Sequence, residues 1–199
     1  MGYWPGPNYA LDDFNLRDRL VEIIKEHGIQ VVVETGLNDG QSTLAFCRMD
    51  TKYGDKISVI GIDHDPQCIE VTKRRLRTDG VLNYTLYLRH SPDCLKELME
   101  YLPDETLFFI DAHWDGECPT LDEIRAITPG KGILVFHDFQ VPGHEHDFGW
   151  DHMIVNGVYY EMNEAFIRPA LFEWSPTYRI EYAKAVSGSK RGFCFVYPS

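Results

Sequence analysis

Polar and ionisable residues follow five successive apolar runs of this 199-residue chain. Each run has the pattern of a β-strand, and the third, over 84–88, alternates between apolar and polar residues. The residues that end or follow these runs are Glu34, Asp63, His90 with Ser91, Asp111 with His113, and His137 with Asp138. In open α/β sheets, ligands bind outside the carboxyl ends of the parallel strands. We therefore expect these side chains to meet at one edge of a sheet and to form a binding or catalytic site.

One group in this set could bind a metal ion. It consists of Asp111, His137 and Asp138. Two carboxylates and an imidazole can hold a divalent metal, and water or substrate oxygens complete the coordination. The alternative is that His137 and Asp138 only shape the pocket. We take these three residues as the predicted metal ligands.

His113 is the predicted general base. It lies two residues after Asp111, and an imidazole of ordinary pKa can remove a proton near neutral pH. Asp111 and His113 are therefore the predicted catalytic residues. The competing interpretation is that His113 is a structural histidine at the entry to a helix.

A glycine loop of the form E-x-G-x-x-x-G follows the first predicted strand and contains Gly36 and Gly40. The dinucleotide fingerprint fails because Asn38 stands where its second glycine belongs, and a phosphate-binding P-loop fails because Gln41 follows Gly40. The simpler alternative is a strand-to-helix turn that merely needs glycine. Asp63 lies roughly twenty residues further on, where a carboxylate can accept the ribose hydroxyls of a nucleoside.

The predicted elements alternate between strand and helix. Strands are expected over 30–34, 57–62, 84–88, 106–110 and 132–136. Helices are expected over 16–27, 42–49, 66–77, 91–101 and 163–172, with a short helix opened by a capping box of Thr120 and Glu123. Strands over 178–185 and 192–197 form a predicted hairpin. This order predicts a three-layer, doubly wound, mostly parallel α/β sheet with a C-terminal antiparallel hairpin.

The chain is expected to form one domain over residues 1–199, with a helical N-terminal segment over 1–29. The segment 140–162 is long and irregular in sequence, and we expect it to be a lid loop over the site. For the carboxylates after the second strand, Asp65 before Pro66 is a better helix N-cap than Asp63.

The glycine loop resembles the first motif of class I S-adenosylmethionine (SAM) methyltransferases, and the terminal hairpin is similar to their Rossmann-like architecture. Asp111 and Asp138 resemble the metal ligands of catechol-type and macrocin-type sugar O-methyltransferases. The resemblance covers roughly residues 15 to 197. It departs from the catechol type at His137, where that type has acidic or amide chemistry beside the second ligand.

This resemblance implies SAM as a cofactor and Mg²⁺ or another divalent metal as a second cofactor. In the family, the metal binds two adjacent substrate hydroxyls and lowers the pKa of the attacking one. Glu34 would face the methionine amino group, Asp63 the ribose, and His90 with Ser91 the adenine. The residues that the resemblance assigns to SAM are Glu34, Gly36, Gly40, Ser42, Asp63, His90, Ser91 and Asp111.

The composition limits the classes of molecule that this protein is expected to bind. The net charge is −12, which disfavours a nucleic-acid partner, and no apolar run is long enough to span a membrane. The five cysteines are scattered without a C-x-x-C pair, which argues against a zinc cluster and favours a reducing, cytoplasmic location. We expect a small-molecule acceptor; a homodimer is compatible with the sequence.

The sequence therefore predicts SAM-dependent methyl transfer to a hydroxyl of a small molecule of the sugar or secondary-metabolite type. Two alternatives stay open. One is a metal-dependent hydroxylase or hydrolase, since the D…HD pattern is similar to that of a cephalosporin hydroxylase of this fold. The other is a non-catalytic protein that binds SAM or a nucleoside, which would not need Asp111, His113 and Asp138 together.

Overall fold

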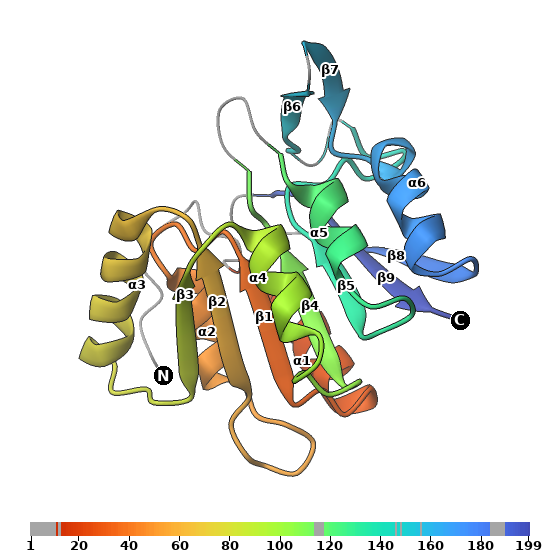
Figure 1. Ribbon diagram of the computed structural model, residues 1–199. Coiled ribbons are helices and arrows are strands. Elements are labelled where there is room, and N and C mark those ends of the chain that lie inside the picture. Colours follow the sequence, from red (N-terminus) through yellow and green to blue (C-terminus); the bar gives the residue numbers. More distant parts are fainter. Residues whose placement is uncertain are drawn as a thin grey trace.

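The computed structural model describes residues 11, 13–113, 118–145, 147, 149–155, 157–183 and 190–199. Its centre is a seven-stranded sheet in the order β3-β2-β1-β4-β5-β9-β8 (Figure 1). The strands are β1 (Val31–Thr35), β2 (Ser58–Asp63), β3 (Tyr84–Leu88), β4 (Thr106–Ile110), β5 (Ile133–Phe136), β8 (Tyr178–Ala183) and β9 (Phe193–Pro198). The first five are parallel, whereas β9 runs antiparallel to both of its neighbours. The predicted fold class is confirmed.

Helices cover both faces of this sheet (Figure 1). They are α1 (Phe14–Glu26), α2 (Gln41–Arg48), α3 (Pro66–Thr78), α4 (Ser91–Leu98), α5 (Thr120–Ala126) and α6 (Glu164–Trp174). One core cluster joins α1, α2 and α3 to residues such as Val32 of β1, and the other joins α4, α5 and α6 to residues such as Val33. Because successive strand residues face opposite sides, strands buried on both faces must be apolar almost throughout.

Two local predictions are wrong. The capping box at Thr120 does not form, because Pro119 is the N-cap of α5 and the side chain of Glu123 is fully buried. The segment after β5 is only partly irregular, since β6 (His152–Val155) and β7 (Val158–Glu161) pair as an antiparallel hairpin, which projects beyond the main sheet (Figure 1). Residues 1–10 of the predicted N-terminal segment lie outside the described residues.

The described part of the chain contains no helix with both the length and the apolar character that a membrane span requires.

Candidate functional site

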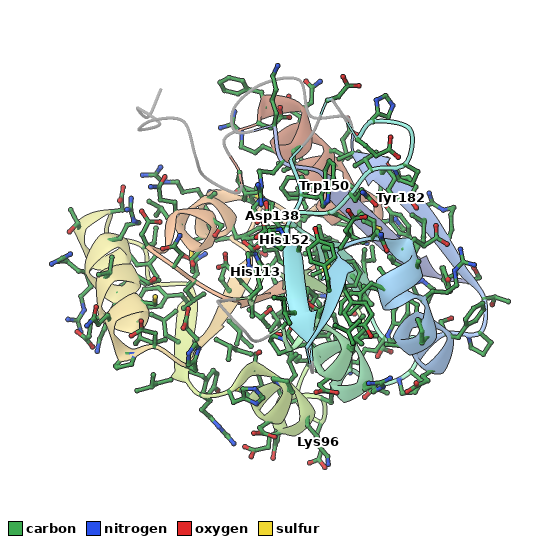
Figure 2. All side chains as sticks on the ribbon, turned by 90° about the horizontal axis from the view of Figure 1, so that it is seen from above. Lys96, His113, Asp138, Trp150, His152 and Tyr182 are labelled. Carbon is green, nitrogen blue, oxygen red and sulfur yellow. The ribbon has the colours of Figure 1, made fainter. Side chains whose placement is uncertain are left out.

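The site lies at the carboxyl edge of the parallel strands, which Figure 2 views from above. Register places Thr35 of β1 beside Ile110 of β4, and Ile110 beside Phe136 of β5. The residues that follow these strand ends therefore lie next to each other. This topology brings Asp111, which follows β4, together with Asp138, which follows β5.

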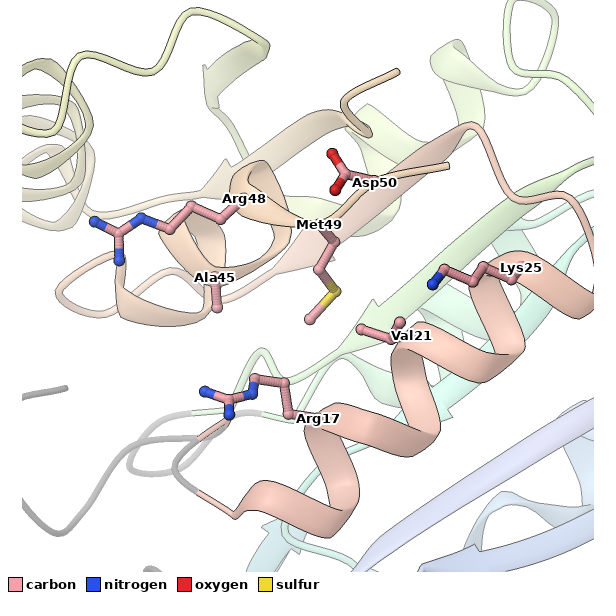
Figure 3. Close-up of a pocket in the computed structure, with 7 residues that line it drawn as sticks. All are labelled: Arg17, Val21, Lys25, Ala45, Arg48, Met49 and Asp50. Atoms are coloured by element: carbon pink, nitrogen blue, oxygen red, sulfur yellow. The ribbon is translucent and has the colours of Figure 1, made fainter. Parts of the chain in front are cut away.

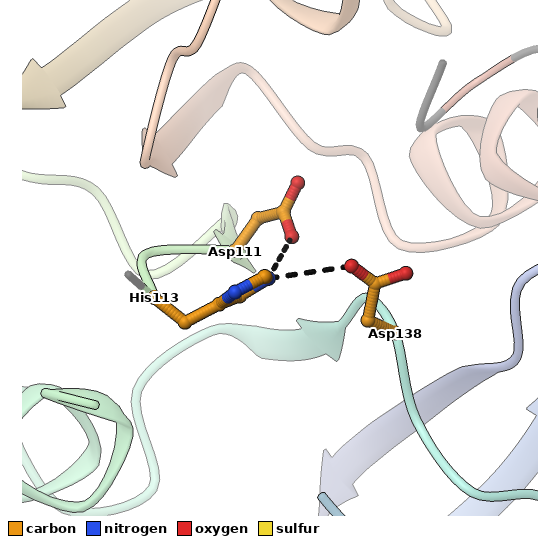
Figure 4. A group of neighbouring side chains, drawn as sticks. All are labelled: Asp111, His113 and Asp138. Carbon is orange, nitrogen blue, oxygen red and sulfur yellow. Dashed lines mark ion pairs between the residues drawn. The ribbon is translucent and has the colours of Figure 1, made fainter. Parts of the chain in front are cut away.

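His113 lies between the two carboxylates (Figure 4). Its Nε2 is 3.5 Å from Oδ1 of Asp111 and 3.3 Å from Oδ2 of Asp138. One potential ligand atom from each of these three residues lies within 4.8 Å of the others. The arrangement is a compact, mostly buried Asp-His-Asp cluster with the donor set of a divalent metal site.

The charge on His113 follows from these neighbours. Burial opposes a positive imidazole, but hydrogen bonding and charge from Asp111 and Asp138 outweigh it and raise the pKa of His113 to about 11. The two carboxylates therefore favour the protonated form of this ring. The role of His113 as general base stays a prediction.

His137 also lies between the two carboxylates, since its Nε2 is 3.4 Å from Oδ1 of Asp138. Its Nδ1 is 2.8 Å from Oδ1 of Asp111, and its ring packs against Phe193 with centroids 4.7 Å apart. Only 8% of His137 is exposed. His113 thus reaches both carboxylates with one nitrogen, whereas His137 contacts them with two different nitrogens and packs against the aromatic core. The set of metal ligands stays a prediction.

Two further residues of this site have no sequence signal. Asp151 places its Oδ2 3.1 Å from Nδ1 of His113. Arg191, which precedes β9, donates from Nε to Asp138 and from its Nη2 to Asp151. Only the antiparallel insertion of β9 beside β5 brings Arg191 to this edge.

A narrow crevice opens next to this cluster. It is lined by Gly36, Ile62, Asp63, His64, Arg89, Ser91 and Ala112. The carboxylate of Asp63 is 8% exposed and accepts from the backbone N–H groups of Leu37 and Asp65, each at 2.8 Å. These two bonds fix its orientation at the mouth of the glycine loop. Asp65 is the N-cap of α3, as predicted.

Gly36 is required by space as well as by conformation. Its φ is +75°, and a Cβ there would lie 2.6 Å from the carbonyl oxygen of Asp111. Gly40 has a different reason: its φ is +76°, and a Cβ would meet Thr72 of α3 at 2.6 Å. Gly36 lines the crevice, whereas Gly40 permits close packing of α2 on α3. For Gly40 the structure therefore agrees with the alternative of a turn that merely needs glycine.

Glu34, which was predicted to face the methionine amino group of SAM, does not line the crevice. It is fully buried, and its carboxylate accepts from the hydroxyls of Ser42 and Thr43, the latter at 2.6 Å. Burial raises the pKa of Glu34 to about 8 although these hydroxyls oppose the rise. Glu34 and Ser42 therefore bind each other and fix the start of α2 on β1; Glu34 has no exposed surface, whereas Ser42 is 7% exposed.

The predicted adenine residues lie at the start of α4. Ser91 is buried and lines the crevice, while the His90 side chain is half exposed and its Nδ1 is 3.5 Å from Oδ2 of Asp93. Behind Ser91 lies Glu123, another residue that sequence reasoning did not place here. Burial raises the pKa of Glu123 to about 7.

A larger groove of about 350 Å³ runs between α1 and the C-terminal half of α2 (Figure 3). Its walls contain Arg17, Lys25 and Arg48 over an apolar floor that includes Met49. None of the residues that end the parallel strands lines it, so its size does not make it the reactive site.

Comparison with known proteins gives the fold a context. No family model and no curated protein matches the sequence. Among solved structures, the chain is similar to an O-methyltransferase from Bacillus cereus in complex with SAH (S-adenosylhomocysteine), with TM-score 0.64, 15% identity, and coverage of 98% of this chain and 84% of that one. This chain has the methyltransferase fold.

Two further structures share it. The O-methyltransferase TomG from Streptomyces achromogenes, which acts in tomaymycin synthesis and was solved with SAM, matches with TM-score 0.60 and 15% identity over 92% of this chain and 79% of that one. An rRNA methylase from Streptococcus thermophilus matches with TM-score 0.52 and 14% identity over 92% and 93%. Since the fold serves both acceptor classes, the acceptor must be argued from the site.

Proposed function

We propose that this protein is a SAM-dependent methyltransferase that acts on a hydroxyl of a small molecule and uses a divalent metal. The observation that carries the proposal is the junction of two features at one sheet edge. The crevice beside Gly36 and Asp63 adjoins the Asp-His-Asp cluster, so a nucleoside-bound methyl donor and a metal-bound acceptor would be neighbours. Proximity of this kind supplies much of the catalysis in an in-line transfer.

The crevice has a volume of about 10 Å³, which holds about one water molecule, so SAM would bind here only after the surrounding side chains move apart. The chemical groups that line it suit SAM. Gly36 permits the close backbone approach of Asp111 and Ala112 beside the crevice, and Asp63 presents an oriented carboxylate whose oxygens each keep a lone pair for a ribose hydroxyl. Ser91 and Ala112 border the same space. When bound, SAM would supply an electrophilic methyl group on its sulfonium.

The cluster of Asp111, His113 and Asp138 fits a divalent cation. Two carboxylate oxygens and Nε2 of His113 already converge, and these carboxylates, which raise the pKa of His113, favour a positive charge at this position. Such a cation would act as a Lewis acid that lowers the pKa of an acceptor hydroxyl. His113 would lose its proton to bind the metal, and His137 would hold Asp111 in place.

Isothermal titration with S-adenosylhomocysteine, with Mg²⁺ present and after chelation, tests this proposal. We expect micromolar binding, at least tenfold weaker in Asp63→Ala but within threefold of wild type in Asp111→Ala. Asp111→Ala should instead abolish turnover of hydroxylated acceptors. Absence of binding in both conditions would refute the methyltransferase function, and normal binding by Asp63→Ala would refute the ribose assignment.

A further inference from the structure

The segment Gly149–Asp151 is attached to the site by its backbone on two sides. The N–H of Gly149 donates to the carbonyl of Lys190 at 2.8 Å, and the N–H of Gly192 donates back to Gly149 at 2.9 Å. The N–H of Asp151 donates to the carbonyl of Asp138 at 2.9 Å. These bonds hold residues 149–151 against the loop after β5 that carries Asp138.

This attachment brings the carboxylate of Asp151 to the outer nitrogen of His113. Its Oδ2 lies 3.1 Å from Nδ1, while Nε2 of the same ring faces Asp111 and Asp138 (Figure 4). The two nitrogens of His113 therefore have separate partners. A carboxylate on Nδ1 fixes both the orientation of the ring and the tautomer that leaves Nε2 free to bind a metal.

Arg191 completes the arrangement. It donates to Asp138 from Nε and to Asp151 from Nη2, so one planar guanidinium fixes two carboxylates relative to each other. One of these carboxylates belongs to the Asp-His-Asp cluster, and the other holds its histidine. Arg191 also balances a negative charge that the cluster alone would leave in excess.

We propose that Asp151, held by Arg191, is a positioning residue that presents Nε2 of His113 to the metal. The inference rests on the metal site of the proposed function and extends it: residues 149–151 of the segment after β5 become part of the metal centre. Metal affinity would then depend on a residue that is not itself a ligand.

The exposed pair of His144 and Asp147 provides a matched control. Nδ1 of His144 lies 2.8 Å from Oδ2 of Asp147, so Asp147→Asn removes the same charge from a His-Asp pair in the same segment. Outer carboxylates of this kind typically change metal affinity by about 10- to 100-fold.

Mn²⁺ titration of the purified protein, followed calorimetrically, tests the inference. We expect Asp151→Asn to weaken Mn²⁺ binding at least tenfold, Asp151→Glu to restore part of it, and Asp147→Asn to stay within twofold of wild type. The visible spectrum of the Co²⁺-loaded protein should change in Asp151→Asn, since the histidine nitrogen would leave the coordination sphere. Titration with S-adenosylhomocysteine should give the same affinity in all variants.

Wild-type affinity for Mn²⁺ in Asp151→Asn would overturn the inference and leave the proposed metal site standing. Failure of wild type itself to bind Mn²⁺ would overturn both. If Asp151→Asn does not fold, Arg191→Lys serves as the second variant. It keeps the positive charge but cannot bridge two carboxylates in the same way, so a loss of about threefold or more would support the inference and an unchanged affinity would overturn it.

Discussion

Two buried glutamates beside the site show how partners decide the behaviour of the same residue type. Both lose hydration, which raises the pKa of a carboxyl group. Glu34 receives hydroxyl donors from Ser42 and Thr43. The hydroxyls of Ser91 and Thr35 oppose the rise at Glu123, but within the described residues neither of its oxygens has a hydrogen bond of normal geometry. A buried carboxylate without a partner is costly when charged.

We therefore predict that Glu123→Gln stabilises the protein at neutral and higher pH. The pKa of Glu123 rises from 4.5 to about 7 on folding, so its contribution to stability is largest below pH 4.5 and is lost as the pH rises through 7. Glu123→Gln should match wild type near pH 4.5 and exceed it above pH 7 by up to about 3 kcal/mol. Urea unfolding across this range measures the difference.

The exposed Glu100→Gln should leave the pH dependence of unfolding unchanged. If Glu123→Gln follows the wild-type pH profile, the carboxyl group is not protonated on folding and the assignment is wrong.

Gly36 gives a second prediction at the residue scale. Gly36→Ala must accept a positive φ and a Cβ 2.6 Å from a backbone oxygen. We expect a loss of about 2–4 kcal/mol in the free energy of unfolding and at least tenfold weaker binding of S-adenosylhomocysteine. Gly80→Ala shares the positive φ, at +68°, but has open space, so it should cost about 1 kcal/mol and leave binding intact. Equal losses in the two variants would contradict the packing argument.

At the scale of elements, the turn between β2 and α3 separates two carboxylates with different functions. Asp65 accepts from the N–H of Gln67 at 2.7 Å and caps the helix. Asp63 holds the glycine loop through Leu37 and faces the crevice. The sequence predicted the cap at Asp65, and the fold adds the contact of Asp63 with the glycine loop.

Asp65→Ala should accordingly reduce stability by about 1 kcal/mol, the usual cost of losing an N-cap, with no change in affinity for S-adenosylhomocysteine. Chemical denaturation tests the predicted loss of stability, and calorimetric titration of the same preparations tests the unchanged affinity. A tenfold loss of affinity in Asp65→Ala would show that the ribose assignment belongs to the wrong carboxylate.

At the scale of the whole molecule, the net charge of −12 bears on the proposed acceptor class. A polyanion would be repelled, because nucleic-acid binding depends on cationic side chains that neutralise phosphates. The cations lining the groove between α1 and α2 are few, and Arg48 already pairs with Asp79. The charge distribution favours a small acceptor over RNA.

We predict that fluorescence anisotropy with a labelled single-stranded RNA shows no saturable binding at about 0.15 M salt, where the Debye length is about 8 Å. The free protein should methylate small hydroxylated molecules but not ribosomal RNA. Binding that weakens steeply as salt increases would instead reveal a basic face and reopen the nucleic-acid alternative.

The sequence by itself determined the architecture. Strands over 84–88 and 106–110 match β3 and β4, and the alternation of apolar strands with helices implied a parallel sheet. It also predicted that Asp63, Asp111 and Asp138 lie at one edge, because parallel strands bring their carboxyl ends to one edge whatever the details of packing. Local pattern was enough here because each of these inferences depends on period and order along the chain.

Only the tertiary structure decided how those side chains share their contacts. It placed His113 as well as His137 between the acids, buried Glu34 against the start of α2, and brought in Asp151 and Arg191. Arg191 lies 53 residues beyond Asp138, and no periodicity relates them. Their contact exists because β9 inserts antiparallel beside β5, and hydrogen bonds between distant segments depend on three-dimensional position, which local sequence does not encode.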